Sequence, residues 1–202
     1  MSKIVRFPVT QAPQKLGPKK VRKRKKVNLE DYGQLNLFNQ AREIRVISLT
    51  QAGNYFEEAL RLDEKNDPRA EDFYLLAIKH NQSKSDAYCN LGILKNDTQK
   101  SSEAINYLTK CLEIDPRHFE AHYNLANLYS DLGNYPLAKV HYEVAIQIEP
   151  EYPNCYFNIG LVLISMKRFN EAISHIKRYM ELSPETDHHT ATELLNTLTA
   201  LG

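Results

Sequence analysis

The sequence contains no tryptophan and only seven glycines among 202 residues. Glycine-rich loops that hold phosphate groups need several glycines close together, and the nucleophile elbow of many hydrolases needs the pattern G-x-S-x-G. Neither pattern occurs in this chain. Carboxylates are plentiful, but no pair of them stands out as an acid and a base. We therefore expect a protein without catalytic residues and without a cofactor.

Cysteine and long apolar runs are also scarce. The three cysteines, Cys89, Cys111 and Cys155, are far apart and form no C-x-x-C pair, which is typical of reduced thiols in a cytosol-like compartment. No stretch approaches the roughly 20 apolar residues that span a membrane, and the first residues lack the apolar centre of a secretory signal. We expect a cytoplasmic protein, or a nuclear one if the organism is a eukaryote.

Acidic residues are missing from the first 26 positions, which hold ten lysines and arginines. The remaining residues hold 26 − 10 = 16 basic and 25 acidic side chains, so an arm of charge +10 precedes a body of charge −9. Few large apolar residues and several prolines and glycines predict that residues 1–27 form a disordered basic arm. Its main cations are Lys19, Lys20, Arg22, Lys23, Arg24, Lys25 and Lys26.

A repeat of 34 residues occupies most of the body. Residues 87–116, 121–150 and 155–184 align without a gap, with a small residue at Gly92, Ala126 and Gly160 and a proline at Pro116, Pro150 and Pro184. Apolar residues at helical spacing indicate two helices per unit, and the small residue allows a neighbouring helix to approach closely. A degenerate unit precedes these three, and one more amphipathic helix follows them.

In these residues the chain resembles the tetratricopeptide repeat family, a helix-turn-helix repeat of 34 residues with small residues at fixed places. The resemblance implies an all-α fold, an α-solenoid of about four repeats. A degenerate first repeat covers 51–84, and further repeats cover 85–118, 119–152 and 153–186. A capping helix covers 187–202, and residues 28–50 form a transitional segment or an N-terminal cap.

Asparagines recur at 34-residue spacing on the first helix of three repeats, at Asn90, Asn124 and Asn158. Family resemblance places these helices on a concave groove, where relatives use such asparagines to hold extended peptides. One amide both donates and accepts, so it can match the N–H and C=O of a peptide unit for about 0.5–1.5 kcal/mol per hydrogen bond. We expect these amides to face solvent, and we expect ligand side chains to contact Tyr123, Asn127 and Phe157.

The resulting hypothesis is a non-enzymatic scaffold that binds a protein or peptide partner. Some relatives hold acidic chaperone tails with lysines and arginines, but the matching places here are Cys89, Ile93 and Tyr123. The alternative hypothesis is a nucleic-acid-associated factor, because eight cations in residues 15–26 can bind phosphates weakly and without sequence preference. The basic arm could also dock onto the acidic body of its own chain.

The pentapeptide QLNLF at 34–38 has two interpretations. Gln34, Leu35, Leu37 and Phe38 match a peptide that bacterial polymerases insert into the sliding clamp. The same apolar residues could instead cover the open end of the first repeat as a cap.

Two histidines, His118 and His122, lie four residues apart, a spacing that could place both on one metal. The glutamate of the H-E-x-x-H pattern is absent, so a packing role is favoured and no metal site is predicted.

Overall fold

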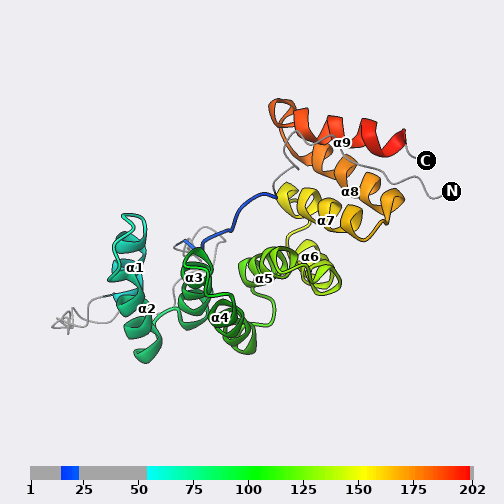
Figure 1. Cartoon of the computed structure of the whole chain (residues 1–202). Helices are drawn as coiled ribbons and strands as arrows, with labels where there is room; N and C mark the ends of the chain where they lie inside the picture. The colour runs from blue at the N-terminus through cyan, green and yellow to red at the C-terminus, as the bar shows by residue number, and fades with distance from the viewer. Residues whose placement is uncertain (1–14, 23–53, 201–202) are drawn as a thin grey trace, which may run out of the picture.

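The computed structural model describes residues 15–22 and 54–200, and within these ranges the chain is helical without strands (Figure 1). A short 3₁₀ turn, Glu185–Asp187, precedes the last helix. The helices are α1 (Tyr55–Asp63), α2 (Ala70–Lys79), α3 (Lys84–Asp97), α4 (Ser101–Ile114), α5 (Phe119–Asp131), α6 (Tyr135–Ile148), α7 (Pro153–Ser165), α8 (Phe169–Leu182) and α9 (His189–Thr199). The predicted all-α solenoid is confirmed.

Successive helices pair as hairpins, and the hairpins stack side by side into a curved array. The contacts run α1–α2, α3–α4, α5–α6 and α7–α8 within the hairpins, and α2–α3, α4–α5 and α6–α7 between them. The first helices of neighbouring hairpins also touch, α3 with α5 and α5 with α7. Figure 1 shows α3, α5 and α7 along the inner face of the curve.

Small residues set the distance between the two helices of a hairpin, as the repeat pattern predicts. A methyl group added to Gly92 would lie 2.6 Å from Cγ of Leu108, and one added to Gly160 would lie 2.8 Å from Cγ1 of Ile176. Both distances are shorter than a carbon–carbon contact allows, so these helix pairs approach closely because glycine is present.

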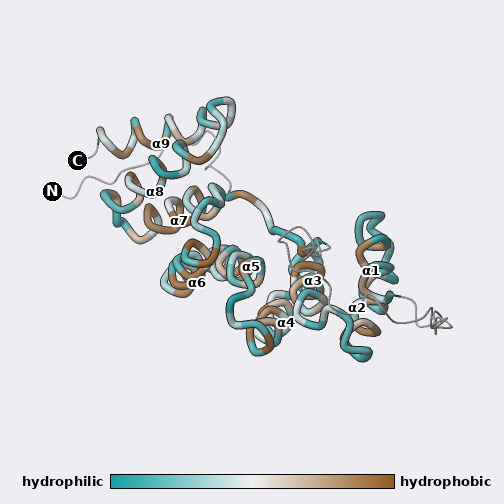
Figure 2. Tube along the Cα trace, turned by 180° about the vertical axis from the view of Figure 1, so that it is seen from behind, coloured by the Kyte–Doolittle hydropathy of each residue, from teal (hydrophilic) through white to brown (hydrophobic). Residues whose placement is uncertain are grey.

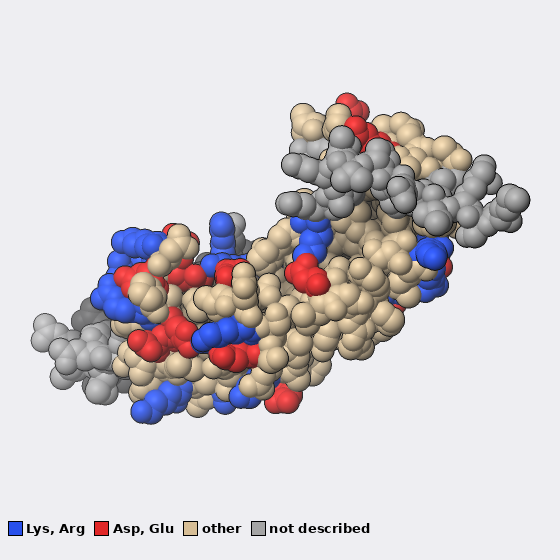
Figure 3. Space-filling view, viewed as in Figure 1, with Lys and Arg blue, Asp and Glu red and all other residues tan. Residues whose placement is uncertain are grey.

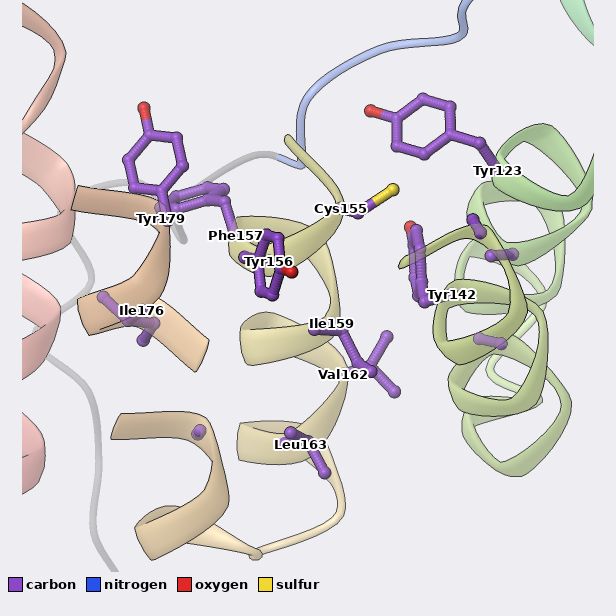
Figure 4. Packing of buried hydrophobic residues seen from close by; sticks show 14 of the residues in the cluster. Tyr123, Tyr142, Cys155, Tyr156, Phe157, Ile159, Val162, Leu163, Ile176 and Tyr179 are labelled. Atoms are coloured by element: carbon purple, nitrogen blue, oxygen red, sulfur yellow. The ribbon is translucent and has the colours of Figure 1, made fainter. Parts of the chain in front are cut away.

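Apolar side chains line the contacts between helices, and polar ones cover the outside (Figure 2). In the last two hairpins, Ile159, Val162 and Leu163 of α7 are almost fully buried between α6 and α8 (Figure 4). The three cysteines are buried free thiols, as expected for Cys111 in an apolar helix stripe. The core is therefore built repeat by repeat, and each layer packs on the next.

Helix α9 closes the C-terminal end of the stack. Its residues Ala191, Leu194 and Leu198 are buried against the core of the last hairpin, and Leu195 is half-buried. Glu193 and Thr192 on its other side are exposed. The predicted cap thus shields the last repeat from water.

No helix in residues 54–200 is both long enough and apolar enough to cross a membrane.

Candidate functional site

Residues 15–22 lie across the inner face of the solenoid, and we call them the docked segment. In Figure 1 they run as the blue strip from α7 past α5 to α3, opposite to the order of the repeats. The sequence predicted a disordered arm over 1–27. That prediction is not confirmed for residues 15–22, and the rest of the range lies outside the described residues. The surface of α3, α5 and α7 beneath this segment is named the groove below.

The three repeated asparagines hold the backbone of the docked segment. Each side-chain amide accepts a hydrogen bond from one N–H and donates to the C=O of the same residue. Asn158 pairs with Leu16 at 2.7 and 2.9 Å, Asn124 with Lys19 at 3.0 and 2.9 Å, and Asn90 with Val21 at 3.0 and 3.1 Å. The three asparagines therefore form a ladder that holds the peptide backbone.

The spacing of the ladder suits an extended chain. The residues held are separated by three and then two positions, and three residues of polyproline II backbone span about 9 Å. That length matches the roughly 8–10 Å between the axes of packed helices. Pro18 favours this conformation because its ring fixes φ and biases Gly17 toward an extended form. One peptide unit thus meets one repeat.

A second layer of polar groups orients the asparagines. Nδ2 of Asn158 lies 3.0 Å from Oδ1 of Asn127, which also accepts from the Tyr142 hydroxyl at 2.5 Å. At the other end, Nδ2 of Asn90 donates to the Tyr74 hydroxyl at 3.2 Å. These partners are almost fully buried, so the amide planes are held in the orientation that the docked backbone needs.

Two apolar side chains of the docked segment enter the core. Val21 is only 2% exposed and packs in the same cluster as Cys89 and Ile93 of α3. Leu16 packs on the cluster around α7 and is half-buried. Ordering one backbone residue costs about 1–2 kcal/mol, more than one hydrogen bond returns, so burial of these side chains is needed to hold the segment.

Lysines of the segment meet carboxylates from four different helices or their ends. Nζ of Lys15 lies 2.5 Å from Asp131, Nζ of Lys19 lies 3.1 Å from Glu149, and Nζ of Lys20 lies 2.8 Å from Asp63. Lys15 also donates to the main-chain oxygen of Asn127. Burial lowers the pKa of Lys15, and its hydrogen bond and attraction to Asp131 oppose that shift.

Acidic groups on the body thus lie where the basic segment crosses it, although they follow no 34-residue period. Figure 3 shows basic and acidic side chains interleaved over the α1–α3 end of this face. The overall charge split indicated such an attraction, but the individual carboxylates Asp63 and Glu149 were not predicted. Nothing in the repeat pattern marks them.

The other predicted ligand contacts differ among themselves. The Tyr123 hydroxyl donates to the Leu16 carbonyl at 3.0 Å, so this residue contacts the segment through its backbone rather than a side chain. Phe157 is 4% exposed and stacks on Tyr179, with ring centroids 5.0 Å apart. The expectation that the asparagine amides face solvent is wrong for this state, because the docked segment covers them and leaves Asn124 4% exposed.

Of the remaining arm residues, Arg22 is exposed, whereas Lys23, Arg24, Lys25 and Lys26 lie outside the described residues. The pentapeptide Gln34, Leu35, Leu37 and Phe38 lies outside them as well. Its two interpretations stay open.

The two histidines have structural partners. Nδ1 of His118 accepts from the Ala121 N–H at 3.2 Å and caps α5, while its Nε2 lies 3.0 Å from Asp86. His122 lies 3.0 Å from Nδ1 of His141 and is buried, which agrees with a packing role. Among residues 15–22 and 54–200, no three potential ligands gather as a metal site would require.

Comparisons with known proteins agree with this architecture. Three tetratricopeptide repeat models match residues 107–139, 126–167, and both 85–118 and 153–186, and together they cover 85–186 without a gap. The human protein O-mannosyl-transferase TMTC3 is 28% identical over 136 residues. The match covers 65% of this chain but only 15% of that protein.

Solved structures show the same fold. MamA from Desulfovibrio magneticus RS-1 superposes with a TM-score of 0.60 at 20% identity, covering 73% of this chain and 92% of that one. The first repeat domain of Spaghetti (RPAP3), bound to the HSP90 peptide SRMEEVD, gives a TM-score of 0.53 at 24% identity, covering 58% and 94%. The chain belongs to the tetratricopeptide repeat family.

Proposed function

We propose that this protein is a non-enzymatic scaffold whose groove binds an extended segment of a partner protein. The observation that supports this most strongly is the ladder of Asn90, Asn124 and Asn158, which bonds to backbone groups at three successive repeats. Every peptide carries these groups, so the ladder accepts segments from other proteins as well as its own. The structure bound to an HSP90 peptide shows that a related fold holds a peptide.

In this proposal the docked segment is an internal competitor. It occupies all three rungs of the ladder, so a partner segment must displace it before binding. The segment is attached to its own body, which gives it a high effective concentration, and a partner therefore needs either higher affinity or a change that releases the segment.

The test uses an open-groove variant, which is the full chain carrying Leu16→Asp, Lys19→Glu and Val21→Asp. A fluorescent peptide of residues 13–24, the chain's own docked sequence, serves as the ligand and anisotropy reports its binding. We expect the open-groove variant to bind the peptide more tightly than the unaltered chain does.

Adding Asn124→Ala to the open-groove variant removes two hydrogen bonds and should weaken the peptide about tenfold. Asn106→Ala is the matched control, because Asn106 is exposed on the outer helix α4. Equal affinities for the Asn124 and Asn106 variants would contradict the role of the ladder, and so would a failure of the open-groove variant to bind the peptide. Circular dichroism melting of each variant checks that the fold is kept.

The nucleic-acid alternative gains no support from the comparisons. Lys15, Lys19 and Lys20 are paired with carboxylates in the groove, which takes three of the eight cations away from phosphate binding in this state. We do not propose it as a second function.

A further inference from the structure

The side chain of Lys19 ends in a site built from two aromatic rings and two carboxylates. Its Nζ lies 4.2 Å from the centroid of the Phe119 ring and 4.4 Å from that of Tyr152. The same atom is 3.1 Å from Oε2 of Glu149 and 4.0 Å from Oε1 of Glu120. We call these four residues the lysine cage.

The rings of the cage stand almost perpendicular to each other. Their planes make an angle of 79°, with centroids 5.1 Å apart, so the ammonium lies within cation–π range of both. Each ring contributes attraction through its negative face, and Glu149 adds a charged hydrogen bond. The side chain of Lys19 is 28% exposed, so water weakens these interactions only in part.

The cage is held by helix ends that the fold fixes. Phe119 is the first residue of α5 and Tyr152 is the N-cap of α7, while Glu149 is the C-cap of α6. The C-terminal end of a helix favours a cation, so α6 adds to the attraction. Asn124 holds the N–H and C=O of Lys19 itself, which fixes where the side chain enters.

The corresponding junction one repeat earlier has no such site. Counting back 34 residues, Phe119 corresponds to Ser85, Tyr152 to His118 and Glu149 to Asp115. His118 is fully buried and bonded to Asp86, so it presents no open ring face to a ligand. The cage is therefore a feature of one position along the groove and not a by-product of the repeat.

We infer that the groove selects partner segments by a lysine at the position of Lys19, bound in the cage of Phe119, Tyr152, Glu120 and Glu149. This rests on the proposed function and deepens it. The asparagine ladder binds any extended backbone, and the cage then favours a basic segment. Val21 adds a requirement for an aliphatic residue two positions later, because its side chain is almost fully buried.

The experiment compares 13–24 peptides that lose one charge at different positions, on the open-groove variant. Lys19→Gln should weaken binding at least tenfold. Arg22→Gln removes the same charge from an exposed side chain and should change the affinity less than twofold at the same salt concentration. A peptide with acetyl-lysine at position 19 keeps the length but not the charge, and it should bind like the Lys19→Gln peptide.

A double-mutant cycle links the effect to the cage. Tyr152→Leu in the open-groove variant should weaken the parent peptide several-fold and leave the Lys19→Gln peptide nearly unchanged. Equal loss with both peptides would show that Tyr152 acts only on the shape of the groove and would overturn the inference.

Equal effects of Lys19→Gln and Arg22→Gln would also overturn it, by showing general attraction to a basic peptide. In that case the proposed function would still stand, provided that Asn124→Ala weakens the parent peptide. Binding that no substitution in the ladder alters would instead count against the proposed function itself.

Discussion

Asparagine is suited to the ladder because its side chain copies the hydrogen-bonding pattern of a peptide unit. Asn90, Asn124 and Asn158 are each almost fully buried once the segment is docked. A buried amide without partners is costly, so each asparagine is stable in the dry groove only while a backbone occupies it or water replaces that backbone. The same residue therefore acts as a structural contact in one state and as a binding residue in another.

One pair of histidines makes the stability depend on pH. Burial lowers the pKa of His141 to about 4, with repulsion from His122 as the second cause, and burial also lowers the pKa of His122. The unfolded side chains titrate near 6.5, so below that pH the unfolded state binds more protons than the folded one.

We expect the free energy of unfolding to fall as the pH decreases from about 6.5 to 4. For His141 the loss is about 1–2 kcal/mol, after allowance for water around the half-buried ring. Urea unfolding at pH 7.5 and 5.0 measures it. His141→Phe should reduce the difference between the two pH values, whereas His189→Gln, at an exposed position, should leave it unchanged. A His141→Phe protein with the same pH dependence as the parent would contradict this assignment.

At the scale of the helix pair, sequence reasoning worked because the constraints are local. The small residues at Gly92 and Gly160 mark close helix contacts, and the 34-residue period follows from them and from the prolines. The ladder was also visible in the sequence, since one residue type recurs at one place. The lysine cage was not, because Phe119, Tyr152 and Glu149 come from three helix ends whose proximity only the superhelix creates.

The close contact of α3 and α4 gives a prediction whose sign is informative. Replacing a helical glycine by alanine usually stabilises a protein by about 0.5–1 kcal/mol. At Gly92 the added methyl would lie 2.6 Å from Leu108, so Gly92→Ala should instead destabilise by about 1–3 kcal/mol. The corresponding place in the next repeat is already an alanine, Ala126. Thermal unfolding measures the change, and a higher melting temperature would show that the helices can move apart freely.

At the scale of the whole molecule, docking of residues 15–22 joins the most basic part of the chain to an acidic surface. Composition showed that the two parts attract each other, but it did not show where the arm binds. That position depends on the match between the ladder and the extended backbone, together with the burial of Val21. A disorder prediction from composition misses such docking because it counts the segment's own apolar residues and not the surface that receives them.

Docking should leave an alternating pattern of amide hydrogen exchange. The N–H groups of Leu16, Lys19 and Val21 donate to asparagines, whereas the N–H of Lys20 makes no hydrogen bond with the described residues. We expect the first three to exchange at least about tenfold more slowly than Lys20. NMR exchange measurements can test this.

Salt provides the control for that experiment. At about 1 M salt the screening length falls to about 3 Å, so the ion pairs of Lys15, Lys19 and Lys20 weaken and the protection should decrease. The open-groove variant should show no protection at either salt concentration. Uniform exchange of all four amides at low salt would contradict docking through the ladder.

The direction of the docked segment has a mechanical consequence. In a solenoid each repeat touches mainly its neighbours, so the superhelix bends and stretches like a soft spring. The docked segment ties α7 to α3 along the inner curve, as a cord inside the coil would, and so resists extension of the three repeats between. Displacement of the segment by a partner would therefore change the stiffness of the molecule as well as the occupant of its groove. If the partner peptide were shorter than three repeats, the chain would become more compliant when bound than when free.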